Sequence, residues 1–296
     1  MTSAVLGAPA PAPAPAGAPA QAPGAARKRR ARSTGALRGP SLLGLGISMV
    51  WFSLLVLIPL AAVLVSAGSG GWSEFWSTVT SPQTAAAIRL TVMQAGIVTA
   101  LNIVMGTALA WVLVRDRFWG KSALDVIIDV PFALPTIVTG LVLLSLYGPQ
   151  SPLGVDVAST RKAVFLALAF VTLPFVVRTT QPVLEALDRD VEEAAASLGA
   201  SRLTTFRRVI LPALAPAIAA GAALSFARAI GEYGSLVLLS GNLPNRTEVA
   251  SVRILTYLEN GNQAGAAAIA AILLVIALVV IVGLDIIQRR VARRGD

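Results

Sequence analysis

The 296-residue sequence contains no histidine and no cysteine. These two absences exclude His or Cys metal ligands, a Ser-His-Asp triad, a cysteine nucleophile, a His or Cys haem ligand and any disulfide. Charge is scarce as well, since 13% of the residues are charged and 55% are hydrophobic. With a mean hydropathy of +0.75, the chain is too apolar for an ordinary soluble domain. We therefore expect a protein of the lipid bilayer and very little scope for enzyme chemistry.

Six stretches are apolar for long enough, or nearly long enough, to cross about 30 Å of hydrocarbon. They predict an all-α integral membrane protein with one membrane domain over residues 41–290 and a short cytoplasmic tail at 291–296. Pro131 and Pro135 predict a kink in the third span, and Pro216 and Gly221 allow the fifth to tilt or break. The six predicted spans are about 42–67, 86–114, 124–147, 163–180, 212–240 and 264–287.

Residues 1–40 differ from the rest in composition. The first 26 residues hold eleven Ala and six Pro and no charge, and six Lys or Arg follow by residue 38. An Ala/Pro-rich segment offers no core and loses an amide donor at each proline, so we expect a disordered tail. Its basic end could touch lipid headgroups. The apolar run after it is too long for a cleavable signal core, which favours an uncleaved first span over a signal peptide.

The net charge of +9 comes from 24 Lys and Arg against 15 Asp and Glu, which could suggest a nucleic-acid partner. The distribution of the basic residues gives another explanation. With a cytoplasmic N-terminus, eighteen of them fall inside, four outside and two within spans. Cytoplasmic loops of membrane proteins accumulate Lys and Arg, so we expect a multi-pass protein with both termini inside and no nucleic-acid partner.

The longest predicted cytoplasmic loop, residues 185–211, carries clear helix signals. Asp190 is a candidate N-cap with Glu193 placed as in a capping box. Gly199 permits a left-handed turn, and Ser201 is a candidate cap for a second short helix. That helix would place Leu203, Phe206 and Ile210 on one apolar face. From these signals alone the loop is either an interfacial hairpin that anchors two spans or a docking knob for a partner.

The same loop resembles the EAA loop of bacterial ABC importer permeases. That pattern has Glu-Ala-Ala, three residues, Gly, nine residues and Ile-x-Leu-Pro. The chain meets it with Glu193, Ala194, Ala195, Gly199, Leu211 and Pro212, with Val209 where Ile is usual. The substitution removes one methylene at an apolar position. The resemblance implies a type I ABC importer permease whose coupling helix sits in a groove of a cytoplasmic ATPase, with Glu193 and its neighbours at the contact and Gly199 at the bend.

Three further segments resemble the T-type permease subunits of sulfate and thiosulfate importers. They are DVPFALPT at 129–136, PFVVRTTQPVLE at 174–185 and FARAIGEYGS at 226–235, and the similarity runs from about residue 40 to 290. Molybdate or tungstate permeases look similar around the third segment, and they remain the alternative within the family. The resemblance implies a second, homologous permease subunit, two ATPase copies that bind the ATP and Mg²⁺, an extracellular or periplasmic binding protein, and a bacterial cell-membrane location.

The chain itself has no G-x-x-x-x-G-K-[ST] segment, so we expect neither ATP hydrolysis by the P-loop route nor a cofactor in it. A rival reading is an ion-coupled secondary transporter in which Arg228, Glu232 and Asp285 carry the coupling charges. Such a transporter would need no ATPase and would give no reason for the loop pattern. An intramembrane enzyme is a poorer reading still.

Two pairs of charged residues have the four-residue spacing of one helix face. Arg228 and Glu232 lie in a predicted span, where an unpaired charge costs at least about 2.5 to 3.5 kcal/mol, so they should pair or face water. They are either a structural ion pair or part of an oxyanion pathway. Asp125 and Asp129, near Lys121, make a poor metal site, and we interpret them as solvated at the interface. Arg89 is expected to snorkel, and no metal site is predicted.

Overall fold

The structure is a computed structural model that describes residues 39–292. Every regular element in that range is helical, as the composition predicts, and the range contains no strand. The tail predicted over residues 1–40 falls almost wholly outside the described residues, as do residues 293–296. The chain divides into two units, residues 1–53 and 54–296, and each is described by itself.

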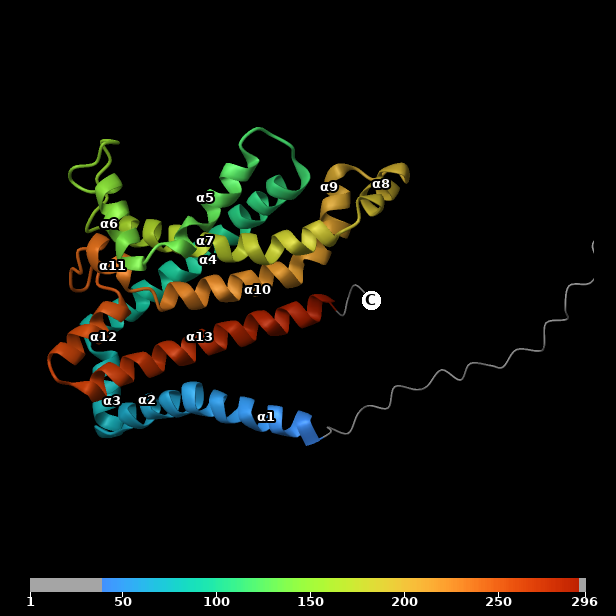
Figure 1. Ribbon diagram of the computed structural model, residues 1–296. Coiled ribbons are helices and arrows are strands. Elements are labelled where there is room, and N and C mark those ends of the chain that lie inside the picture. The colour runs from blue at the N-terminus through green and yellow to red at the C-terminus, as the bar shows by residue number, and fades with distance from the viewer. Residues whose placement is uncertain (1–38, 293–296) are drawn as a thin grey trace, which may run out of the picture. The chain divides into compact units, whose positions relative to one another are not determined.

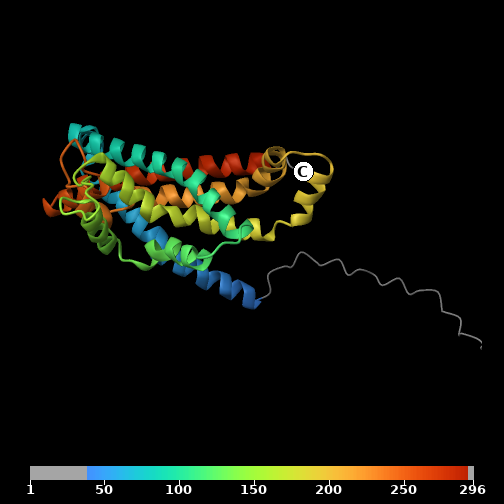
Figure 2. The same cartoon turned by 90° about the horizontal axis from the view of Figure 1, so that it is seen from above.

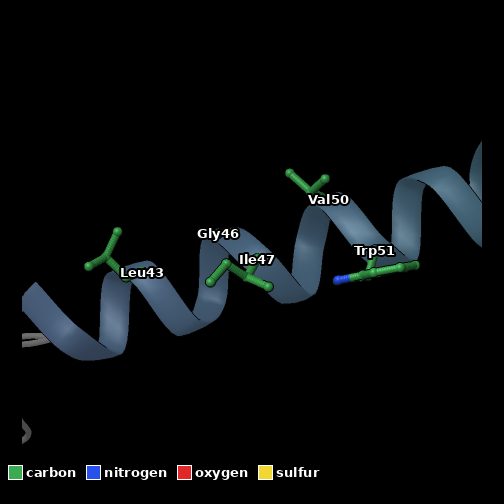
Figure 3. Close-up of a pocket in the computed structure, with 5 residues that line it drawn as sticks. All are labelled: Leu43, Gly46, Ile47, Val50 and Trp51. Atoms are coloured by element: carbon green, nitrogen blue, oxygen red, sulfur yellow. The ribbon is translucent and has the colours of Figure 1, made fainter.

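The described part of the first unit is helix α1, Gly39–Phe52, which leads into a π-helical turn at Ser53–Leu57. Its composition is apolar on every side, as expected of a helix in lipid. Figure 3 shows the flank that carries Leu43, Gly46, Ile47, Val50 and Trp51. The shallow hollow on this flank belongs to a single helix and is almost entirely apolar, so it has no groups with which to orient a polar ligand.

Four long helices form the body of the second unit. Helix α4 packs along α7, α7 along α10, and α10 along α13, as Figures 1 and 2 show. The 34 residues of α4 extend about 50 Å at 1.5 Å per residue, which exceeds the thickness of the hydrocarbon core. The bounds of the four helices are Pro82–Arg115 for α4, Arg161–Ala186 for α7, Leu211–Ile230 for α10 and Gln263–Ala292 for α13.

Shorter helices gather at the two ends of these four (Figure 1). Helices α3 and α12 contact α4, α6 and α11 pack against each other and against α7, and α2 packs along α13. At one end of the long helices lie α8, α9 and a π-helical turn, η2. The bounds are Ile58–Gly68 for α2, Gly71–Thr80 for α3, Lys121–Ala133 for α5, Thr136–Tyr147 for α6, Arg189–Ser197 for α8, Arg202–Thr205 for α9, Phe206–Ile210 for η2, Gly234–Leu239 for α11 and Ala250–Glu259 for α12.

The third predicted span, 124–147, is two helices instead of one. Helices α5 and α6 meet at a bend of 117°. Leu134 and Pro135 at the break are extended. Proline disfavours the α conformation of the residue before it and cannot donate to the helix ladder, so the predicted kink becomes a complete break. In the described residues, five helical segments are long and apolar enough to cross a membrane, or six if the bent pair counts as one span.

The fifth predicted span, 212–240, also ends earlier than expected. Helix α10 stops at Ile230, and α11 begins only at Gly234. The fourth span, predicted at 163–180, is longer in the structure, because α7 continues to Ala186 and takes up the first two residues of the predicted 185–211 loop. The last turns of α7 contain polar residues, so hydropathy alone does not predict that the helix continues.

The centre of the second unit is a close three-helix contact. A Cβ atom on Gly106 of α4 would lie 2.8 Å from the Val176 Cβ of α7, and one on Gly221 of α10 would lie 2.8 Å from the Val176 Cα. Asn102 of α4 reaches across the same region, where its Nδ2 donates to Thr172 Oγ1 at 2.8 Å and to Ser225 Oγ at 3.3 Å. Small residues and interhelical hydrogen bonds are the usual means of holding membrane helices together.

Candidate functional site

The loop singled out by sequence forms a helical hairpin, α8 and α9, at one end of the long helices (Figure 1). Helix α8 begins at Arg189, and its N-cap is Asp188, whose Oδ1 accepts from the Asp190 N–H at 3.0 Å. The prediction of Asp190 as N-cap is therefore wrong by two residues. Only Leu187 separates the last residue of α7 from Asp188, so α8 begins almost as soon as α7 ends.

Gly199 adopts the left-handed conformation that was predicted, with φ of +82°. The Gly199 N–H donates to the Ala196 carbonyl at 2.9 Å, and the Ala200 N–H donates to the Ala195 carbonyl at 3.0 Å. These two bonds form a Schellman motif, which satisfies carbonyls left open at the end of α8. A residue with a Cβ would be strained in this backbone conformation. Gly199 therefore sets the direction in which the chain leaves α8.

The second helix of the hairpin begins as predicted, because the Ser201 side chain accepts from the Thr204 N–H at 3.2 Å. The predicted apolar face is only partly formed: Ile210 is buried, Phe206 packs edge-on against Trp111 at 5.8 Å, and Leu203 is 57% exposed. After Thr205 the helix widens into η2. Pro212, which lacks an N–H, follows this turn, and the Leu211 N–H bonds back five residues to Phe206.

The residues of the predicted coupling set are mostly open to the outside. Glu193, Ala194, Gly199, Leu211 and Pro212 are exposed and Ala195 is half-buried. Glu193 lines a hollow of about 720 Å³ between α8, α9 and the end of α4. Leu211 lies beyond the hairpin and lines an apolar hollow with Trp111 and Phe206. The structure thus gathers the Glu-Ala-Ala and Gly positions on one hairpin and places the Leu-Pro pair at the start of the next long helix.

One ion pair that the sequence did not predict joins the hairpin to the long helices. Arg115, the last residue of α4, places its Nη2 2.6 Å from Glu192 Oε1 and 3.2 Å from the Leu187 carbonyl. The Arg115 side chain is only 10% exposed. Leu187 is the C-cap of α7. A single guanidinium therefore contacts the end of α7 and the first turn of α8.

A second cluster contains Asp125 and Asp129, for which the sequence predicts solvation at the interface. Arg178 of α7 binds Asp129 through two bonds of 2.7 Å, from Nε and Nη2 to the two carboxylate oxygens. Its Nη1 donates to Asp125 Oδ1 at 2.7 Å and to Gln181 Oε1 at 2.6 Å. Both carboxylates keep partial exposure, yet their partner is Arg178, so the assignment to water alone is wrong. The bidentate geometry fastens α5 to α7.

Arg228 and Glu232 do pair, with Arg228 Nη1 2.7 Å from Glu232 Oε2. Glu232 lies beyond the end of α10, and its side chain is fully buried. Its Oε1 accepts from Ser235 N at 2.9 Å and Ser235 Oγ at 2.8 Å, and its carbonyl accepts from Ser251 Oγ of α12 at 2.6 Å. Glu232 therefore joins α10, α11 and α12. Arg228 is the more open member, with 32% of its side chain exposed.

A sequence signal for the missed pairs existed but was incomplete. Arg115, Arg178 and Glu192 all lie where apolar stretches give way to charged ones, and charges at such borders require partners. The two members of each of these ion pairs are 49 to 77 residues apart in sequence. No local spacing identifies them.

Comparison with known proteins identifies relatives of this chain among transport proteins. A family model described as "Binding-protein-dependent transport system inner membrane component" matches residues 102–293. The chain is 41% identical over 259 residues to the sulfate transport system permease protein CysT of Salmonella typhimurium, covering 85% of this chain and 94% of that protein. It is 42% identical over 250 residues to the protein of the same name from Synechocystis, covering 82% and 87%.

Among solved structures, the chain is similar to one from a bacterial alginate ABC transporter in complex with a pentasaccharide-bound periplasmic protein. The TM-score is 0.70 at 19% identity, covering 85% of this chain and 94% of that one. It is also similar to one from the MetNI methionine ABC transporter, with a TM-score of 0.52 at 15% identity, covering 72% and 96%. The fold is that of type I ABC importer permeases, and the chain belongs to the family of inner membrane components of binding-protein-dependent transport systems.

Proposed function

We propose that this chain is the permease subunit of an ATP-driven importer that carries sulfate or thiosulfate into the cell. The observation that carries the substrate is the similarity to sulfate transport permeases, which covers 85% of this chain at 41% identity. The hairpin of α8 and α9 supports ATP hydrolysis by a partner subunit as the source of energy. It presents Glu193, Ala194 and Gly199 on the outside, where a partner can reach them.

The assembly we propose has a second, homologous permease, two copies of a cytoplasmic ATPase and an extracellular or periplasmic sulfate-binding protein. The ATP and Mg²⁺ would be bound by the ATPases, because this chain has no P-loop segment. The excess of Lys and Arg in alternate loops supports a cytoplasmic side for both termini and for the hairpin. The location that follows is the bacterial inner or plasma membrane, with lipid around the apolar helices.

In this proposal, nucleotide-driven closure of the ATPases moves the hairpin and switches the pathway between inward and outward facing. The hairpin is short and well hydrogen-bonded at both caps, so it can be displaced as one piece. It is continuous with α7 on one side and with η2 and α10 on the other. A displacement of α8 therefore reaches two of the long helices directly through the chain.

Arg228 is our candidate for the oxyanion pathway, with Glu232 as its counter-ion. A pathway for sulfate needs a positive electrostatic potential that attracts the anion. It also needs to bind the anion weakly enough for the anion to leave. Arg228 is partly open, and its charge is offset by the buried Glu232 carboxylate at 2.7 Å. This arrangement meets both conditions.

The test is uptake of labelled sulfate by cells that lack their own sulfate importer and co-express this chain with its partner subunits. We expect uptake that needs the ATPase, survives collapse of the ion gradient and resists excess molybdate. Uptake that follows molybdate would transfer the assignment to a molybdate or tungstate importer. Uptake that ignores the ATPase and collapses with the gradient would favour a secondary transporter.

Gly199→Pro tests the hairpin in the same assay. Proline cannot adopt φ of +82° and removes the N–H that donates to the Ala196 carbonyl. We expect uptake to fall at least about fivefold, since backbone substitutions that conflict with the native conformation cost about 1 kcal/mol or more. Gly283→Ala, at a glycine with open space around its Cβ position, is the matched control and should keep uptake. Wild-type uptake by the Gly199 variant would contradict the coupling role.

A further inference from the structure

Two adjacent glutamates on α8 face different surroundings. Glu193, which occupies the Glu position of the family pattern, is exposed, whereas Glu192 is half-buried. Successive residues on a helix point about 100° apart, so one short helix can present one carboxylate outward and turn the other inward. Glu192 turns toward Arg115, and the 2.6 Å between Nη2 and Oε1 is the distance of a charge-assisted hydrogen bond.

The Arg115 contact crosses a region where the packing is otherwise open. Its two partners, Leu187 and Glu192, lie 72 and 77 residues away in sequence. The hollow of about 720 Å³ between the hairpin and the end of α4 is lined by Arg115 and Glu192 themselves. Because side chains do not fill this space, the ion pair is a specific link between α8 and α4.

Helix α4 is in turn closely joined to the other long helices. Gly106 packs against Val176 of α7, and Asn102 bonds to Thr172 of α7 and Ser225 of α10. A movement of the last residue of α4 is thus passed to the middle of the bundle. The chain itself connects α8 to α7 and, through α9 and η2, to α10. It gives α8 no such direct connection to α4.

We propose that the Arg115–Glu192 pair is a positioning contact that makes α4 move with the coupling hairpin, so that α4, α7 and α10 respond together to the ATPase. This inference rests on the proposed function, because it assigns a role in coupling ATP hydrolysis to transport. Glu193 faces the partner and Glu192 holds the hairpin to its own subunit. Loss of the pair leaves the ATPase bound but lets α8 move without α4.

The experiment uses the complete transporter, purified and reconstituted in proteoliposomes with its binding protein. ATP hydrolysis and sulfate uptake are measured on the same preparation, and their ratio is compared between wild type, Arg115→Gln and Glu192→Gln. We expect the ATP used per sulfate to rise about tenfold in both variants, within the range usual for coupling between sites. Arg115→Lys and Glu192→Asp, which keep both charges, should stay within about twofold of wild type.

Arg289→Gln is the matched control, because it removes an exposed ion pair between Arg289 and Asp285, 2.8 Å apart, near the C-terminal end of α13. It should leave the ratio unchanged. A wild-type ratio in Glu192→Gln would overturn the inference, as would a rise in Glu192→Asp equal to that in Glu192→Gln. If the glutamine variants lose the ATPase on purification, the charge-keeping variants decide. If Arg115→Lys and Glu192→Asp assemble and keep the wild-type ratio of ATP to sulfate, the ion pair is supported. If these two variants also fail to assemble, the inference that the charges of the pair matter is overturned.

A second measurement does not depend on the substrate. The chain has no cysteine, so spin labels can be placed at Arg117→Cys, just beyond α4, and at Leu198→Cys, which is 89% exposed on the hairpin. The distance between the labels is measured in the permease without its ATPase, which would otherwise cover Leu198, and we expect Glu192→Gln to broaden the distance distribution. An unchanged distribution counts against the contact even if sulfate proves not to be the substrate. Failure of wild-type sulfate uptake alone counts against the proposed function instead.

Discussion

The two members of the Arg228–Glu232 ion pair differ in exposure, and this difference underlies the role that we propose for Arg228. The Glu232 side chain is fully enclosed and holds the first turn of α11 through Ser235, whereas Arg228 keeps about a third of its surface open. We therefore interpret Glu232 as the residue of the pair that stabilises the structure. The arginine is the member that can meet an anion.

We expect Arg228→Ala to reduce sulfate uptake about tenfold, which corresponds to about 1.4 kcal/mol in the barrier. Assembly should survive, because Glu232 keeps its two bonds from Ser235. The measurement is initial uptake rate at equal amounts of purified complex, with Arg228→Lys as the charge-keeping control. Unchanged uptake in Arg228→Ala removes the pathway role.

The double variant Arg228→Ala with Glu232→Gln separates the two roles. Removing one partner of a buried pair leaves the other charge uncompensated, which is itself destabilising. If the arginine only balances Glu232, neutralising both side chains restores uptake. If the arginine meets the anion, uptake stays low in the double variant.

At the scale of elements, the break between α5 and α6 depends on where α6 packs. Helix α6 lies against α11, and both contribute a glycine to the contact. A Cβ atom on Gly140 of α6 would lie 2.8 Å from the Ser235 carbonyl oxygen, and one on Gly234 of α11 would lie 2.8 Å from the Ile137 nitrogen. These short approaches hold α6 in its bent position relative to α5.

We therefore expect Gly140→Ala to lower the free energy of unfolding of the purified protein by about 1 to 3 kcal/mol, the usual cost of overpacking, and so to lower its melting temperature. Gly96→Ala in α4 is the control, because nothing lies within 4 Å of the Cβ position there. Thermal unfolding of both variants in the same detergent is the measurement. Equal melting temperatures for the two variants would show that the α6 and α11 contact is looser than described.

At the scale of the whole second unit, the 26-residue helix α7 separates two segments. The loop that precedes α7 lies at one end of this helix, and the hairpin that follows it lies at the other end. The Lys and Arg distribution predicts that the hairpin end is cytoplasmic. Because the chain lacks cysteine, a single introduced thiol reports its own side of the membrane.

We expect a membrane-impermeant maleimide to label Val155→Cys in intact spheroplasts and to label Leu198→Cys only after the membrane is opened. Both positions are exposed, at 46% and 89%. The permease is expressed without its ATPase, so that a partner does not cover Leu198. The reverse labelling pattern would invert the topology and remove the basis for placing the ATPase at the hairpin.

The sequence by itself determined what depends on composition and on neighbouring residues. Apolar length predicted the membrane class, Gly199 predicted the left-handed turn, and Ser201 predicted the cap of the second helix. Each of these follows from the chemistry of a residue within its own turn of helix, so no distant partner is needed.

Only the tertiary structure decided which distant segments meet. The break at Pro135 was foreseeable, but its angle of 117° requires a neighbour for α6 to pack against. The carboxylate partners of Arg115 and Arg178 lie 49 to 77 residues away. The helical period predicts which residues share a face of a helix, but it does not identify the helix that packs against that face. Long-range pairing is set by packing of whole helices, and that is why the contacts holding the hairpin became visible only in the fold.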